Sequence, residues 1–133
     1  MSCAILSDTG PLFAAIDPHD GHHNRALRDV KRIARESWVV MVASPILLEA
    51  YSLTLYKLGT EPAATFLSEV LTSGTLVNPS SEDYLAAAAK LAAFPDQSIT
   101  LVDATLAVLA KRLDVEVWTY DHHFDIMRAA VWR

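Results

Sequence analysis

Short apolar segments alternate with helical segments along this 133-residue chain, and this alternation constrains the fold more than any other feature. Four of the segments have the length and the apolar or β-branched content of strands: residues 3–7, 38–43, 75–78 and 115–120. Strands separated by helices pair in parallel, because each connection must cross back over the sheet. The sequence therefore predicts an α/β fold with a mainly parallel sheet of four to five strands between helices, residues 130–132 being the candidate fifth strand.

The helical segments carry start and stop signals. Ser44 and Pro45 form a cap followed by proline at the first helical position, and Gly59 ends that segment, which predicts a helix over 45–58. A second segment starts at residue 60 and ends at Gly74. The other helices are expected over 12–16, 21–36, 81–93 and 100–113, with a loop or helical turn over 121–127.

The composition indicates one compact domain over residues 1–133, because 52% of the residues are hydrophobic and only 20% are charged. Charges interrupt every apolar run well short of the ~18 residues of a membrane span. The first ten residues lack the features of a signal peptide. A single cysteine, Cys3, excludes an internal disulfide and is expected to be a small buried residue. We therefore expect a cytoplasmic protein that does not enter the membrane.

One acid, Asp103, interrupts the most apolar helix of the chain, and an ionised carboxylate there is costly unless it is paired or bound. Asp8 directly follows the first strand, Asp121 follows the fourth, and Glu49 lies early in the helix after the second. Ligands gather outside the carboxyl ends of parallel strands. We expect these four acids to meet at one edge of the sheet, provided that the connection over 94–99 brings the helix of Asp103 to that edge.

Four carboxylates close together cannot all stay ionised unaided, so their convergence predicts a compensating cation. Oxygen ligands without clustered cysteines favour one or two Mg²⁺ or Mn²⁺ ions over zinc. Two such ions ~3.5–4 Å apart would activate water and stabilise the leaving oxygen in phosphodiester cleavage.

Each acid also has a purely structural alternative. Asp103 follows Thr100 by three residues, as in a capping box. Asp8 is placed to end a strand and begin a turn, and Asp121 to be an ordinary loop acid. Glu49 would then face solvent from its helix. The functional interpretation depends on the joint placement of all four residues.

Five segments, in this order and spacing, resemble the PIN domain family, and most closely the small VapC-type toxins of toxin–antitoxin pairs. These segments cover nearly the whole chain: ILSDTGPLFAAID (5–17), DPHDGHHNRA (17–26), SPILLEAYSL (44–53), ITLVDATLAVLAKRL (99–113) and VWTYDHHFD (117–125). The resemblance implies a PIN-like three-layer α/β/α sandwich. It also implies a Mg²⁺- or Mn²⁺-dependent endoribonuclease that forms homodimers and is inhibited by a cognate antitoxin.

Carried over by position, the acidic quartet of the family falls on Asp8, Glu49, Asp103 and Asp121. Thr119 matches the small hydroxyl residue before the last acid, and Asp125 is a secondary candidate. Asp8 and Asp103 are expected to be the principal metal ligands. Glu49 and Asp121 would complete the charge and orient water for attack on phosphorus, with the 3′ oxygen leaving.

The histidine-containing segments match loop positions of the family that do not bind a metal. The resemblance therefore implies that the histidines lie at the surface or near the substrate rather than in a metal site: His19, His22, His23, His122 and His123.

Bases and apolar residues mark two candidate contact surfaces. Arg25, Arg28, Arg32 and Arg35 recur at intervals of three, four and three residues, which places them on one helix face as a candidate RNA contact. The alternative is a solvated face that Asp29 and Glu36 dilute, since the formal net charge of −5 argues against binding by bulk charge. The other surface is apolar: Tyr51, Leu53, Leu55, Tyr56 and 66–71 could form core, a dimer contact or an antitoxin contact.

Four other functions are compatible with parts of the sequence. An RNase H-like nuclease would need an antiparallel opening hairpin between Asp8 and Glu49, and none is visible. Phosphoaspartate chemistry on Asp8 would need a second acid at position 10, which is Gly10. A module that only binds RNA or protein would be more stable without four mutually repelling acids, so their presence argues against it. A housekeeping RNA-processing PIN nuclease stays open.

Overall fold

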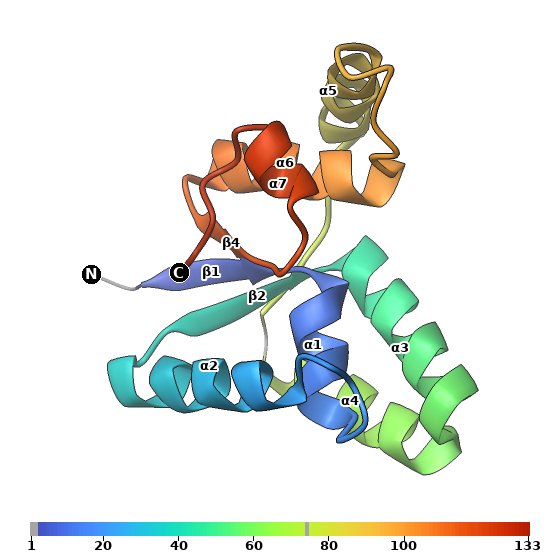
Figure 1. The fold of residues 1–133 in the computed structure, drawn as a ribbon, viewed down its shortest axis with the longest axis vertical. Coiled ribbons are helices and arrows are strands. Elements are labelled where there is room, and N and C mark those ends of the chain that lie inside the picture. The colour runs from blue at the N-terminus through green and yellow to red at the C-terminus, as the bar shows by residue number, and fades with distance from the viewer. Residues whose placement is uncertain (1–2, 74) are drawn as a thin grey trace.

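The computed structural model describes residues 3–73 and 75–133, and its centre is a four-stranded parallel sheet (Figure 1). β1 (Ala4–Ser7) pairs with β2 (Val39–Ala43) and with β4 (Glu116–Trp118), while β3 (Leu76–Val77) pairs with β2. The strand order is therefore β3-β2-β1-β4. This confirms the predicted sheet, to which the segment 130–132 adds only a single parallel bridge to Val117.

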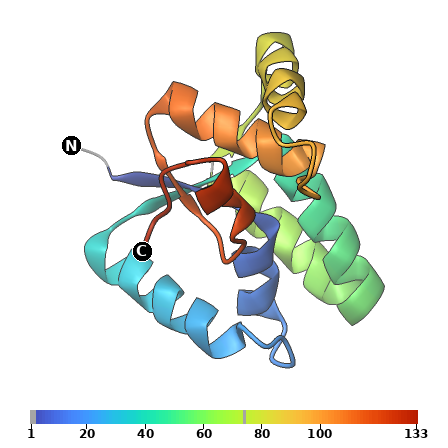
Figure 2. The same cartoon turned by 45° about the horizontal axis from the view of Figure 1, so that its top comes forward.

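Helices cover both faces of this sheet. Figure 1 shows α6 and α7 on one side and α1, α2 and α4 on the other, and Figure 2 shows α5 standing away from the sheet. The fold is thus the predicted three-layer α/β/α arrangement. No helix in the described ranges joins the length and the apolar character needed to cross a membrane. The bounds are α1 (Thr9–Ile16), α2 (His23–Glu36), α3 (Ser44–Leu58), α4 (Thr60–Ser73), α5 (Ser81–Ala92), α6 (Leu101–Leu113) and α7 (His123–Ile126).

The observed elements differ from the predicted ones mainly at their ends. α1 starts three residues earlier than predicted, because Asp8 accepts a hydrogen bond from the Thr9 amide and caps the helix. The fourth strand ends at Trp118, and the predicted turn over 121–127 contains α7. The predicted helix end at Gly74 lies outside the described residues.

The main core forms where both helical layers meet the sheet. Side chains from β1, α3, α6, β4 and α7 are almost completely buried there: Leu6, Ile46, Leu106, Val117 and Phe124. A smaller cluster joins Ile5, Trp118 and Trp132. Burial of these large side chains fixes the positions of the strand ends that carry the acids.

The prediction that Cys3 is buried is wrong. Its thiol is free and exposed, although its carbonyl accepts a hydrogen bond from the Val39 amide at 2.8 Å. The backbone therefore continues the sheet pairing one residue before β1, while the first fully buried side chain is that of Ile5. Cys3 belongs to the same apolar run as Ile5, but the helices that cover the sheet do not cover it. The sequence of the run alone does not show where this cover begins.

A buried acid joins α5 to α6. The Asp83 carboxylate accepts hydrogen bonds from Arg112 Nε at 2.8 Å and Nη2 at 2.7 Å, and another from the Ser80 amide at 2.8 Å. The Arg112 guanidinium holds the pKa of Asp83 at about 2, well below its usual range. This pair fixes the position of α5, which otherwise projects from the molecule.

Candidate active site

Two of the predicted acids follow neighbouring strands. β1 and β4 pair with Ser7 opposite Trp118, and the Asp8 amide donates to the Trp118 carbonyl at 2.9 Å. This pairing brings Asp8 beside Thr119, whose hydroxyl donates to Asp8 Oδ2 at 2.8 Å. The same hydroxyl accepts a hydrogen bond from the Asp121 amide at 3.0 Å. Thr119 therefore connects the acid after β1 to the acid after β4.

The start of α6 brings Asp103 to the same edge of the sheet. Asp8, Asp103 and Asp121 each offer a carboxylate oxygen, and these oxygens all lie within 4.8 Å of one another. The three residues are separated by up to 113 positions in the chain, so only the tertiary fold assembles them. We call Asp8, Asp103 and Asp121 the acidic cluster.

Glu49 lies at the rim of this site. It lines the same hollow as the acidic cluster, a cavity of about 420 Å³ that Asp20, His22 and Tyr120 also line. Its side chain is exposed, and its oxygens are not among those within 4.8 Å of one another. The structure thus gathers three acids of the predicted quartet tightly and places the fourth beside them.

Burial sets the charge state of the cluster in the absence of metal. The pKa of Asp8 is raised from 3.8 to about 6, mainly by burial and in smaller part by the charges of Asp103 and Asp121, while hydrogen bonds from Thr119 and Thr9 oppose the rise. Burial also raises the pKa of Asp103, against its hydrogen bonds with Thr100. Three crowded carboxylates that offer only oxygen donors fit a hard divalent cation such as Mg²⁺ or Mn²⁺.

The capping roles predicted as alternatives coexist with this clustering. Asp103 forms a capping box with Thr100, through an amide-to-hydroxyl bond of 3.1 Å and a return bond of 3.4 Å. Asp8 caps α1, and Asp121 Oδ1 accepts from the His123 amide at 2.9 Å at the start of α7. Each cap orients its carboxylate, so the caps help to build the site.

His123 is a site residue whose position the sequence did not reveal. Its Nδ1 lies 3.3 Å from Asp121 Oδ1 and 4.0 Å from Asp103 Oδ2, and its side chain is only 18% exposed. Nδ1 has no hydrogen-bond partner among the described residues. Asp121, His122 and His123 also form a second group of candidate ligands. The sequence does place His123 two residues after Asp121. That spacing points the side chain of His123 towards the acids only when a helical turn begins there, as α7 does.

The remaining predicted residues lie outside the acidic cluster. Asp125 is exposed and pairs with Arg133. Arg25 stacks on Tyr120, 4.1 Å from the ring centroid, and so contacts a residue of the hollow. Arg32 stacks on Trp132 at 4.3 Å and pairs with Glu36. Arg28 and Arg35 are exposed on the same helix.

Replacing Thr119 with valine is expected to lower the RNA cleavage that the family resemblance implies by about 10–100-fold. Valine removes the donor to Asp8 and the acceptor for the Asp121 amide, and loss of such orienting partners typically costs this much activity. Initial cleavage rates at saturating Mn²⁺ measure the effect. Thr119→Ser keeps the hydroxyl and is the matched control. Wild-type activity in the valine variant would show that this hydroxyl does not organise the acids.

The chain was compared with solved structures, and three similar ones agree in fold over nearly their whole length. VapC20 from Mycobacterium tuberculosis, described as a Sarcin-Ricin loop cleaving toxin, has a TM-score of 0.84 at 20% identity, covering 97% of this chain and 98% of that one. FitAcB from Neisseria gonorrhoeae has a TM-score of 0.73 at 19% identity, with 97% and 96% coverage. VapBC2 from Rickettsia felis, bound to a DNA fragment from its promoter, has a TM-score of 0.73 at 14% identity, with 98% and 97% coverage.

Two further comparisons concern sequence. A search of curated proteins gives no match. The family model of the PIN domain matches residues 5–129, which include every acid of the site. The matched range runs from β1 to the segment after α7, and the parallel sheet and three-layer fold agree with it. The chain belongs to the PIN domain family.

Proposed function

We propose that the protein is a metal-dependent endoribonuclease that acts as the toxin of a toxin–antitoxin pair. The observation that carries this proposal is the acidic cluster, whose oxygens lie within 4.8 Å of one another. A partly buried group of like charges is costly to keep, so a cation that offsets them is its simplest explanation. RNA is the proposed substrate because the similar VapC20 is described as a toxin that cleaves the Sarcin-Ricin loop.

The residues of the site have separable roles in this proposal. Asp8 and Asp103 would hold Mg²⁺ or Mn²⁺, one or two ions. Asp8 is buried and Asp103 partly buried, and burial raises the pKa of both carboxyls. When bound, such ions supply charge for the scissile phosphate and lower the pKa of water. Asp121, positioned through Thr119, would complete the charge. Glu49, at the rim, would orient the attacking water.

The direct test is cleavage of a mixed-sequence single-stranded RNA with Mn²⁺ and with EDTA. Water attacks phosphorus and the 3′ oxygen leaves with a proton, so the products carry 5′-phosphate and 3′-hydroxyl ends. Cleavage that needs Mn²⁺ and yields these ends supports the proposal. Products with 2′,3′-cyclic phosphates, or cleavage that persists in EDTA, would contradict it.

An apolar groove supports the proposal of a protein partner. It has a volume of about 360 Å³ and lies between α1, α2, β2 and α4, with Ile16, Val30, Ile33 and Phe66 among its lining residues. Val30 and Val39 are each 40% exposed there. A cognate antitoxin is proposed to cover this groove. A small DNA-binding protein encoded next to this chain that inhibits cleavage would support a toxin, and its absence would favour a housekeeping nuclease.

Exposed leucines on three helices support the proposal of a homodimer. Leu48 of α3, Leu85 of α5 and Leu101 of α6 are 68%, 72% and 49% exposed, and large side chains of this kind favour burial against a partner. Leu85→Glu is therefore expected to convert the dimer into a monomer. Light scattering coupled to gel filtration measures the mass. Leu71→Glu, at a leucine of α4 that is 53% exposed, is the control and should leave the dimer intact.

The proposal assigns the activity to the whole chain. We expect residues 1–133 to act as one PIN-like domain. The exposed, unpaired thiol of Cys3 suits the reducing cytoplasm, where we expect the protein to act.

A further inference from the structure

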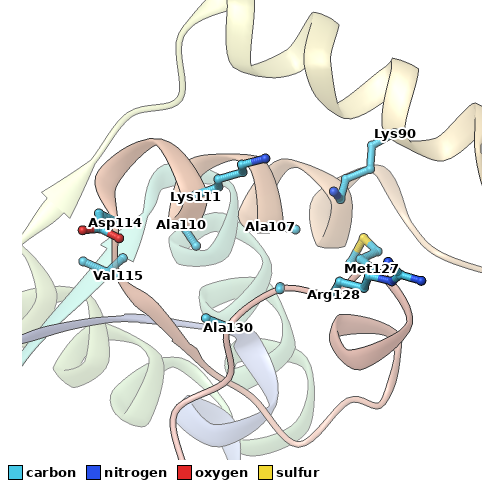
Figure 3. A pocket seen from close by; sticks show the side chains of 10 residues that line it. Lys90, Ala107, Ala110, Lys111, Asp114, Val115, Met127, Arg128 and Ala130 are labelled. Atoms are coloured by element: carbon cyan, nitrogen blue, oxygen red, sulfur yellow. The ribbon is translucent and has the colours of Figure 1, made fainter.

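A third cavity lies between α5, α6 and the segment that follows α7 (Figure 3). Its volume is about 340 Å³, and no residue of the acidic cluster lines it. Small or apolar side chains form part of its wall, including Ala107, Ala110 and Met127, which are all buried. Three bases from three different elements complete the lining: Lys90, Lys111 and Arg128. We call this cavity the basic pocket.

The three bases of the basic pocket carry uncompensated charge. None of them forms an ion pair within residues 3–73 and 75–133, whereas Arg112 and Arg133 nearby in the sequence pair with Asp83 and Asp125. In Figure 3 the Lys90 side chain points towards Met127 and Arg128. Asp114, the one acid of the lining, lies at the opposite end of the cavity in that view. The end near Lys90 and Arg128 is therefore suited to an anion.

The backbone at Arg128 is strained. Arg128 has φ 57°, in the left-handed region, and it follows α7 at the position where helices usually place glycine. The Ala129 amide donates to the Phe124 carbonyl at 2.9 Å, and the Arg128 amide donates to the Asp125 carbonyl at 3.0 Å. This is the Schellman pattern. The left-handed conformation is less favourable for arginine than for glycine. An arginine at this position therefore suggests that its cationic side chain has a function.

We propose that the basic pocket binds a phosphate of the RNA substrate, away from the bond that is cleaved. This inference rests on the proposed ribonuclease activity and names a second contact of the same substrate. Lys111 lies eight residues after Asp103 in α6, about 12 Å along the helix axis. The chain also runs from His123, beside the acidic cluster, through α7 to Arg128 in the basic pocket, two residues after the helix ends. One strand of RNA can therefore follow α6 and α7 from one site to the other.

The chemistry of the pocket favours a phosphate within a nucleotide chain. Lysine and arginine donate charge-assisted hydrogen bonds to phosphate oxygens, and the arginine fork can do so with two bonds. The alanine and methionine wall offers apolar contact to the attached sugar or base. An acidic catalytic site repels RNA, so a chain with net charge −5 needs such local cationic contacts to hold its substrate.

The test measures RNA affinity without metal, so that no cleavage occurs. A short fluorescein-labelled single-stranded RNA of mixed sequence is titrated by anisotropy in EDTA at several salt concentrations. Lys90→Ala and Arg128→Gly are each expected to weaken binding about fivefold. Each lost phosphate contact should also lower the slope of log K against log salt by about 0.7. Lys57→Ala, which removes a single base at the end of α3, is the control and should change neither quantity.

Arg128→Gly also separates binding from folding. Glycine relieves the left-handed strain, so the midpoint of thermal unfolding should stay equal or rise while RNA binding weakens. Arg128→Lys keeps the charge and should restore most of the affinity. With Mn²⁺, the pocket variants should raise KM for RNA and leave kcat unchanged, because the pocket does not touch the acidic cluster.

Three outcomes would overturn the inference. If both pocket variants bound RNA as tightly as wild type, the pocket would not bind RNA, and an acidic peptide would be the next anion to test. Loss of inorganic pyrophosphate binding with unchanged RNA affinity would assign the pocket to a free phosphate compound. An equal loss in Lys57→Ala would indicate only bulk charge. If wild-type protein bound RNA through this pocket but never cleaved it, the pocket would stand and the ribonuclease proposal would fail.

Discussion

Replacing Asp8 with asparagine is expected to lower Mn²⁺-dependent RNA cleavage by at least about a thousandfold and to stabilise the metal-free protein at pH 7. The loss of activity follows because Asp8 is the most buried acid of the cluster and a proposed metal ligand. Asparagine keeps an acceptor for the Thr9 amide and a group that can donate to the Thr119 hydroxyl. The fold should therefore survive the change.

The gain in stability has a defined dependence on pH. The pKa of Asp8 is raised from 3.8 to about 6 in the folded protein, so between these values the folded state binds more protons than the unfolded state. Metal-free wild-type protein therefore loses stability as the pH rises through this window, by up to about 3 kcal/mol. Asp8→Asn removes this dependence. Urea unfolding in EDTA at pH 4 and pH 7 measures it, and an Asp8→Asn variant less stable than wild type at pH 7 would contradict the account.

Replacing Asp103 with asparagine is expected to abolish cleavage almost as completely, while the metal-free protein at pH 7 stays at least as stable as wild type, because burial raises the pKa of Asp103 as well. This variant separates the two roles of Asp103, because asparagine can still accept the capping hydrogen bond from the Thr100 amide but carries no charge. If capping were its only role, activity would be kept. Measuring RNA cleavage and thermal unfolding on the same preparation gives the activity and the stability of the variant.

The matched control for this variant uses the other capping box of the chain. Ser80 and Asp83 form the same motif at the start of α5, where Asp83 pairs with Arg112 instead of other acids. Asp83→Asn should lower stability, because it weakens a buried ion pair, and leave kcat unchanged. Equal losses of activity in the Asp83 and Asp103 variants would mean that Asp103 supports catalysis only by capping its helix and not by binding a metal.

The sequence predicted the parallel sheet and the helices because their signals are local. A run such as 38–43 has the length and branching of a strand, and Ser44, Pro45 and Gly59 mark the ends of α3 within a few residues of chain. The exact strand ends were less predictable. Trp118 ends β4 two residues early because Thr119 turns to bond Asp8, a residue 111 positions away. Contacts at that separation leave no local pattern.

The acids of the candidate site were predictable as a set, but their geometry was not. Their positions after strands and at a helix start indicated one edge of the sheet. The sequence did not indicate that Glu49 lies at the rim while the other three crowd together, since that depends on how α3 and α6 pack. Nor did it indicate the half-buried position of His123, which depends on the short helix α7. The left-handed backbone of Arg128 was not predictable either, because no glycine or asparagine marks that position in the sequence.

The most direct test of a metal-binding acidic cluster is thermal unfolding with and without Mn²⁺. At a free Mn²⁺ concentration a hundredfold above Kd, the account predicts a rise in Tm of about 8 °C that EDTA reverses. The rise should be lost in Asp8→Asn and kept in Asp125→Asn, whose exposed acid pairs with Arg133. A wild-type Tm that does not respond to millimolar Mn²⁺, or an equal response in the Asp8 variant, would contradict the account.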